Sequence, residues 1–143
     1  MANVIPFTFR GALFSGTHNF ASGGNTFRIA LYTGSIASVY TTSSTVVSST
    51  NEASTGGGSN YTRQALSSQA VASSTAVATV DFGDSTWSSA TFTAAFAAIY
   101  NDDQGDKLCV VLDFGGDKTC TNGTFKITYP DPSTPANAII SMS

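Results

Sequence analysis

Charged side chains are scarce in this chain. They make up 10% of its 143 residues, against roughly 25% in an ordinary globular protein. The six basic residues are scattered along the sequence and the net charge is −3. No basic patch is therefore available to hold a phosphate backbone, and we expect no nucleic-acid partner.

Long apolar runs are also absent. No stretch approaches the roughly 18 consecutive apolar residues that identify a membrane-spanning helix, so we expect no membrane partner. The N-terminal segment MANVIPFTFRGALFSG lacks the basic region and apolar core of a secretion signal. We therefore expect the chain to fold in a cytoplasm.

Residue types that bind metals or act as nucleophiles are few and dispersed. His18 is the only histidine and Glu52 the only glutamate, and the chain has neither a CxxC pair nor a GxSxG nucleophile motif. The acidic stretch 101-NDDQGD-106 lacks the donor spacing of a calcium-binding loop, so we interpret it as a polar turn. We expect no metal, no cofactor and no enzymatic activity.

Cys109 and Cys120 are the only cysteines, and two alternatives remain open for them. In the first, which we favour, they are reduced side chains that fill space. In the second, a hairpin brings them close and they form a disulfide, which would require an oxidising destination.

The abundant residues favour strands. Hydrophobic residues stand at 41%, with ten Phe and five Tyr, and serine and threonine supply much of the polarity. Such a composition is typical of short strands joined by turns. Residues 90–99 are rich in alanine and could be helical, but their Thr, Phe and Ile neighbours favour a strand. The strands that we expect are 26–33, 39–42, 61–66, 76–82, 86–93, 97–100, 107–114, 123–129 and 138–142.

This pattern predicts an all-β fold, an antiparallel β-sandwich of the jelly-roll or immunoglobulin-like kind. We expect residues 26–143 to form the sandwich domain and residues 1–25 to form an N-terminal arm. The arm is too apolar for a free tail, so it must pack on this domain or on a neighbouring subunit. Between the first strands, residues 34–60 form a long loop with a glycine run at 56–58, which we expect to be functional or disordered.

The tripeptide Asp-Phe-Gly occurs twice, at 81–83 and at 113–115. It is a metal-binding signature of protein kinases, but the glycine loop and the HRD motif that a kinase also needs are missing. In both copies an aliphatic residue leads into the tripeptide. We interpret each copy as a strand end, with a buried Phe, a Gly that allows a positive φ and an Asp that binds turn amides.

Several segments resemble a family of small structural proteins of tailed bacteriophages, including phages of cyanobacteria. They are 27-FRIALYTGS, 50-TNEASTGGGSNYTRQAL, 80-VDFGDSTWSSATFTAAFAAIYND, 111-VLDFGGDKTCTNGTFKITYP and the closing ANAIISM. The resemblance covers residues 26–142 and concerns strand cores and turns, without any catalytic signature. Cys109, Cys120 and the longer glycine run depart from the family pattern.

The resemblance implies a virion component present in many copies. The leading expectation is a capsid decoration, or cement, protein on the outer surface of the head. It would be a homo-oligomer, a trimer at threefold positions, that contacts the major capsid protein or other virion proteins. The alternative is a tail, baseplate or fibre-associated protein, in one version a binder of host glycans through Trp87. The expected partner contacts lie in the arm and in the loop 51–61: Phe7, Phe9, Leu13, Phe14, Asn51, Glu52 and Tyr61.

Overall fold

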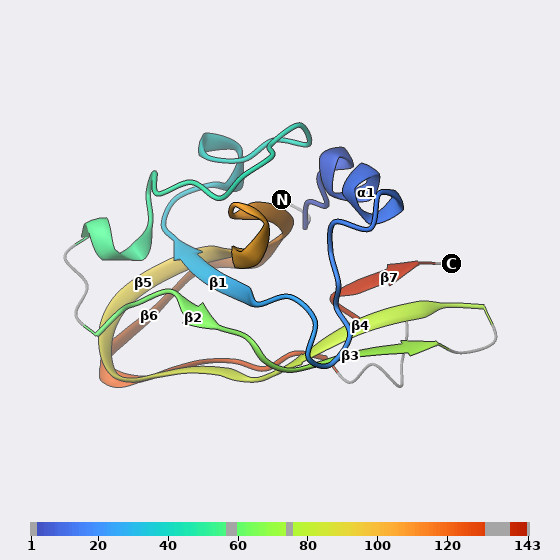
Figure 1. Ribbon diagram of the computed structural model, residues 1–143. Coiled ribbons are helices and arrows are strands. Elements are labelled where there is room, and N and C mark those ends of the chain that lie inside the picture. The colour runs from blue at the N-terminus through green and yellow to red at the C-terminus, as the bar shows by residue number, and fades with distance from the viewer. Residues whose placement is uncertain (1–2, 57–59, 74–75, 131–137, 143) are drawn as a thin grey trace.

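The computed structural model describes residues 3–56, 60–73, 76–130 and 138–142. Strands dominate and form two antiparallel sheets, as the sequence predicts (Figure 1). The elements in chain order are α1 (Phe7–Phe14), β1 (Phe27–Tyr32), η1 (Ile36–Ser38), η2 (Ala53–Gly56), β2 (Gln64–Ala65), β3 (Ser67–Ser73), β4 (Ala78–Gly83), β5 (Ser85–Asn101), η3 (Asp102–Gln104), β6 (Lys107–Ile127) and β7 (Ile140–Met142).

Two stretches of the chain pass directly from one sheet to the other. The four-stranded sheet has the order β2-β1-β5-β6, and the three-stranded sheet has the order β3-β4-β7. Only Leu66 separates β2 from β3, and only Asp84 separates β4 from β5. Each of these two segments therefore runs from one sheet into the other. This crossing allows the two sheets to enclose one apolar core.

The β5–β6 hairpin contains the two longest strands of the fold. Four strands that we expected to be separate are joined in it into two. Residues 86–93 and 97–100 belong to one strand, β5, and residues 107–114 and 123–127 belong to β6. The alanine-rich stretch 90–99 is a strand, as predicted. The expected strand 39–42 does not form. Within the expected strand 61–66, only Gln64 and Ala65 pair with a neighbouring strand, as β2.

The glycines at 115 and 116 form a bulge and not the expected chain-reversing turn. Ala94 pairs with Lys118 and Phe96 with Asp113, so residues 114–117 lie opposite a single residue of β5. Gly115 and Gly116 have positive φ angles, which glycine adopts without steric cost. The strand therefore bends at this point and then continues its pairing.

The two DFG tripeptides use glycine in different ways. In the second copy Gly115 has a φ of 73° and its N–H donates to Asp113 Oδ1 over 2.8 Å, as the sequence predicts. In the first copy Gly83 does not have a positive φ, so that expectation is wrong there. A Cβ at Gly83 would lie 3.0 Å from Ser67 Oγ, a tight contact with the side chain of the paired strand that glycine avoids. Phe82 is buried, and Phe114 packs against the core.

Apolar side chains cover both faces of the four-stranded sheet. One cluster lies between the sheets and is rich in aromatic rings from α1, β1, β4, β5 and β6. A second cluster, which includes Tyr32, Tyr40 and Phe96, lies on the other face under residues 36–47. The second half of β5 is consequently buried on both faces, which explains why its sequence is apolar without alternation.

Residues 3–25 do not extend from the domain as an arm. Phe9 and Phe20 lie in the main core, with Phe20 stacked on Phe27 at a centroid distance of 4.2 Å. Val4 pairs with Val111 of β6. Of the two possibilities that the sequence left open, packing on this domain holds for most of the segment.

Candidate functional site

The N-terminal helix α1 is bonded to a neighbouring segment at its start and is capped by its own chain at its end. At its start the N–H of Phe7 donates to Thr42 O over 3.0 Å, and Thr8 Oγ1 donates to Ser44 O over 2.8 Å. At its end Gly16 has a φ of 70° and its N–H donates to Leu13 O, a conformation that glycine favours after a helix. The position of the helix is therefore set by neighbouring backbone.

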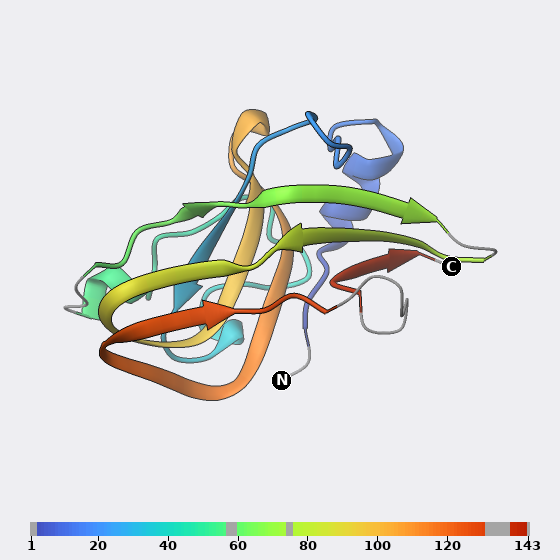
Figure 2. The ribbon, with the colours of Figure 1, turned by 90° about the horizontal axis from the view of Figure 1, so that it is seen from below.

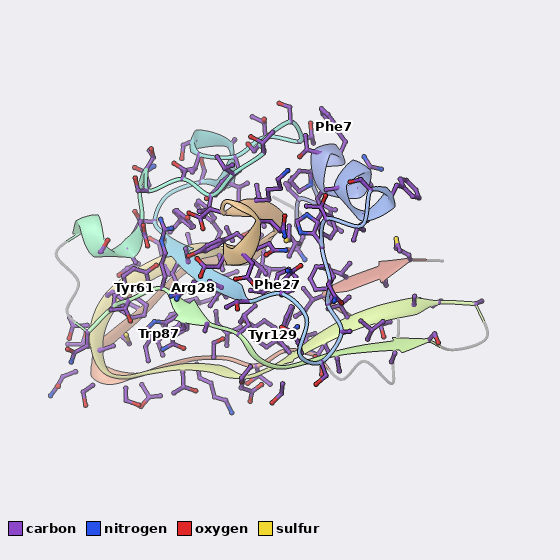
Figure 3. All side chains as sticks on the ribbon, in the orientation of Figure 1. Phe7, Phe27, Arg28, Tyr61, Trp87 and Tyr129 are labelled. Carbon is purple, nitrogen blue, oxygen red and sulfur yellow. The ribbon has the colours of Figure 1, made fainter. Side chains whose placement is uncertain are left out.

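α1 is apolar on two opposite faces. The inner face carries Phe9, which is 2% exposed, and the partly buried Leu13 one turn later. The outer face carries Phe7, which is 52% exposed, and Phe14, which is 93% exposed. Phe7 and Phe14 are two turns apart and so share a face, and in Figure 3 Phe7 stands on the outer side of the helix.

Between the two outer phenylalanines the helix is open. Arg10 and Gly11 lie there and both are exposed. Gly11 adds no side chain, and no atom lies within 4 Å of where its Cβ would be. The outer face of α1, defined here as Phe7, Arg10, Gly11 and Phe14, thus offers two aromatic side chains and one cation to solvent.

Such a surface is suited to binding a protein. Exposed apolar patches on a protein surface mark interaction sites, and aromatic side chains with an accompanying Arg are enriched where interfaces concentrate their binding energy. Ile5, two residues before Phe7, is also exposed, and exposed Val46 lines a hollow with Thr8 and Ala12 of the helix. The outer face of α1 is therefore the candidate functional site.

The structure separates the predicted contact residues into two groups. Phe7, Phe14 and Asn51 are exposed, and Leu13 is half-buried. Phe9, Glu52 and Tyr61 are buried inside this chain, so a partner cannot reach their side chains in this conformation. The one signal in the sequence that distinguishes Phe7 and Phe14 from Phe9 is their spacing of two helical turns.

Glu52 and Tyr61 belong to an internal polar network. Arg63 donates to both carboxylate oxygens of Glu52 over 2.8 and 2.9 Å, and Tyr61 OH donates to Glu52 Oε1 over 2.8 Å. The Tyr61 oxygen in turn accepts the N–H of Leu31. The hydrogen bond to Glu52 raises the pKa of Arg63, and burial raises the pKa of Tyr61. The network fastens the long loop to β1 and supplies no reactive group.

His18 and Cys109 are close enough to suggest a nucleophile, but their protonation states argue against one. His18 Nδ1 lies 4.0 Å from Cys109 Sγ and 3.0 Å from Asn101 Nδ2. Burial, with a smaller contribution from Lys107, lowers the pKa of His18 to about 4. Burial also raises the pKa of the Cys109 thiol. A nucleophilic pair requires a thiolate, and here both groups are neutral.

The remaining candidate sites are structural. Asp102 pairs with Arg28, and Asp103 accepts the N–H of Thr26, which supports the polar turn that we expected at 101–106. Trp87 is 2% exposed and donates to Thr62 O, so its ring is no platform for a sugar. Both cysteines are free thiols.

Among the described residues there is neither a metal-binding cluster nor a membrane-spanning helix. No group of three or more His, Cys, Asp or Glu in that part of the chain is arranged to hold a metal ion. In the same residues no helix has both the length and the apolarity to cross a membrane. Comparison of the whole chain with known proteins found no matching family model, no matching curated protein and no matching solved structure.

Proposed function

We propose that this chain is a structural protein of a bacteriophage virion, a capsid decoration protein that stabilises the head. It acts by docking the outer face of α1 on the major capsid protein. The observation that carries the proposal is the exposure of Phe7 and Phe14 on a helix whose opposite face is already buried. The resemblance of residues 26–142 to virion proteins gives the partner its identity.

The physical basis of docking is burial of aromatic surface at little electrostatic cost. An aromatic side chain buries about 150–250 Å², so the two phenylalanines form the centre of a small interface. Such an interface is weak for one copy, but contacts made by linked copies add through their effective concentration. A homotrimer on the outer surface of the capsid, assembled in the host cytoplasm, would gain affinity in this way.

The low charge of the chain supports the same mechanism. Only 10% of its residues are charged, so an extended contact requires few ions to lose their water. Arg10 is the one cation on the outer face of α1, and it can orient the helix against an acidic group of the capsid protein.

A tail, baseplate or fibre-associated protein remains the second candidate. Its favouring observation is the same outer face of α1, which could dock on a tail protein equally well. Binding of host glycans through Trp87 is not supported, because Phe92, Phe125 and Tyr61 surround its indole ring.

A binding experiment with purified capsids tests the proposal. Heads that lack this chain are mixed with the wild-type protein or with a Phe7→Ser, Phe14→Ser double variant, and bound protein is measured after sedimentation. We expect the double variant to bind at least about tenfold more weakly, which corresponds to a loss of roughly 1.4 kcal/mol in binding free energy. Below saturation, the amount of bound protein should therefore fall by about 90%. The control is Val71→Ser, which removes a similarly exposed apolar side chain from β3.

Cryo-electron microscopy of the virion separates the two candidates. Density at symmetric positions on the head supports decoration, and density confined to the tail overturns it in favour of the second candidate. Unchanged binding of the double variant to heads would contradict the docking of α1 on the capsid.

A further inference from the structure

The outer edge of β6 is open beyond Asp113. β6 is the last strand of the four-stranded sheet, and it pairs with β5 along its inner edge. On the outer edge it meets Val46 and Val4 at Lys107 and Val111, and the N–H of Asp113 donates to Asn3 Oδ1 over 2.8 Å. Beyond Asp113 the described residues place no strand against it. An open edge exposes backbone N–H and C=O groups to which another extended segment can bind.

β6 also bends back on itself. Phe92 pairs with Cys120 and Ala90 with Gly123, so Thr121 and Asn122 lie opposite the single residue Thr91. This bulge forms a corner, where Asn122 has a φ of 45°. Figure 2 shows β5 and β6 turning together at this end of the molecule. The first half of β6, before residue 121, and the second half, after residue 122, therefore lie in two facing layers. Their outer edges are on the same side of the molecule.

A hollow lies between the two halves of β6. Its volume is about 480 Å³, and its apolar lining includes Phe114 and Cys120 from the first half and Phe125 and Ile127 from the second. The rings of Phe114 and Phe125 are 6.2 Å apart. We call this hollow the β6 seam. It gives access to the edge of the main core, which contains Phe125.

The seam is cationic although the chain is acidic. Lys118 and Lys126 line it and no carboxylate does, while the chain as a whole has a net charge of −3. Lys126 is paired with Asp84 over 2.8 Å, and Lys118 is exposed with no ion pair to another described residue. Lysines on an edge strand discourage pairing with a like strand, so a second copy is disfavoured by its own lysines.

We propose that the β6 seam binds an extended segment of a partner protein in which apolar residues alternate with acidic ones. The segment adds to the outer edge of β6 through backbone hydrogen bonds, its apolar side chains enter the hollow, and a carboxylate pairs with Lys118. This surface is separate from the outer face of α1, so the inference goes beyond the proposed docking on the capsid and does not rest on it.

Cys120 gives a built-in reporter for the test. It lines the hollow and is half-buried, whereas Cys109 is fully buried and its thiol has a raised pKa. Iodoacetamide should therefore modify Cys120 in the folded protein much faster than Cys109. The probe is a blocked heptapeptide in which valine alternates with glutamate, and the control peptide has lysine in place of glutamate.

The acidic peptide at saturation is expected to slow the modification of Cys120 by about five-fold or more, and the lysine peptide is expected to leave it unchanged. Lys118→Glu should weaken the protection by the acidic peptide about tenfold. Lys107→Glu is the matched control, because Lys107 lies on the same strand outside the hollow, and it should bind the acidic peptide normally.

Three outcomes would overturn the inference: no protection by the acidic peptide, equal protection by both peptides, or unchanged binding by Lys118→Glu. Protection by sodium octanoate without protection by the peptide would identify the seam as a pocket for small apolar carboxylates and would also overturn it. None of these outcomes bears on the binding of α1 to capsids, so the two proposals fail separately.

Discussion

The helix α1 and the segment formed by residues 48–56 and 60–63 both lie outside the strand ladders of the four-stranded sheet. Their side chains have opposite environments. The segment directs Glu52, Tyr61 and Arg63 inward, where they bind one another and the backbone of β1. The helix directs Phe9 inward but leaves Phe7 and Phe14 in solvent. A segment that completes its own contacts is part of the fold, and one that leaves apolar contacts unmade is available to a partner.

The sharpest test of this comparison lies within α1 itself. Phe9→Ala should lower the free energy of unfolding by about 3–5 kcal/mol, because it removes a ring from the packed core. Phe14→Ala is the matched control on the outer face and should change it by less than about 0.5 kcal/mol. Urea denaturation of both variants measures the difference. Similar losses for the two would show that the outer face is also part of the core.

The ion pair of the segment should have the next largest effect. Glu52→Ala leaves the guanidinium of Arg63, whose side chain is 26% exposed, without its carboxylate. It also leaves Tyr61 OH without its acceptor. We expect a loss of about 2–3 kcal/mol, measured by urea denaturation, and a smaller loss for Glu52→Gln, which keeps an acceptor for Tyr61. A loss below about 0.5 kcal/mol in both variants would mean that the loop is not fastened by this network.

The inner anchor of α1 should depend on pH, because His18 lies against Phe9 with ring centroids 5.1 Å apart. His18 has a pKa of about 4 in the folded chain and about 6.5 when unfolded. Between these values the unfolded state binds more protons. The stabilisation from neutral His18 is thus complete above pH 6.5 and is lost as the pH falls toward 4, by about 1–3 kcal/mol.

Thermal unfolding between pH 6.5 and 4.5 measures this effect before most carboxylates titrate. His18→Phe should give a flatter dependence of the melting temperature on pH in this range. Equal slopes for the wild type and the variant would show that His18 does not control the attachment of α1.

The smallest expected effect concerns the tyrosine pair under the loop. Tyr40 OH donates to Tyr32 OH over 2.8 Å and accepts the N–H of Ser48 over 2.8 Å. Tyr40→Phe should cost about 1 kcal/mol, because it removes these two bonds while keeping the ring. Hydrogen exchange should show faster exchange at the Ser48 amide, and an unchanged rate there would contradict the bond.

Strand content could be predicted from the sequence because it depends on near neighbours. The alternation in residues 26–33 and the β-branched and aromatic residues of 86–93 led to strands that the structure contains. The continuity of β5 and β6 could not be predicted, because the glycines at 115 and 116 also fit a turn. Pairing with β5 on both sides of these glycines turns the same residues into a bulge.

Only part of the candidate site could be predicted from the sequence. Apolar residues at 7–14 marked the helix as a contact element, but the sequence grouped Phe9 with Phe7 and Phe14. In the same way Glu52, a carboxylate in a polar loop, has the local pattern of an exposed residue. Its burial depends on Arg63, and a contact between loop and strand is set by the path of the chain.

The sequence by itself determined that this protein is built from strands and has a surface with little charge. Both properties follow from residue type and local spacing. The tertiary structure alone decided which phenylalanines are covered, which strands join and which edge of the sheet stays open. These outcomes depend on contacts between segments far apart in the chain, such as α1 with the core and β5 with both halves of β6, and local patterns do not specify such contacts.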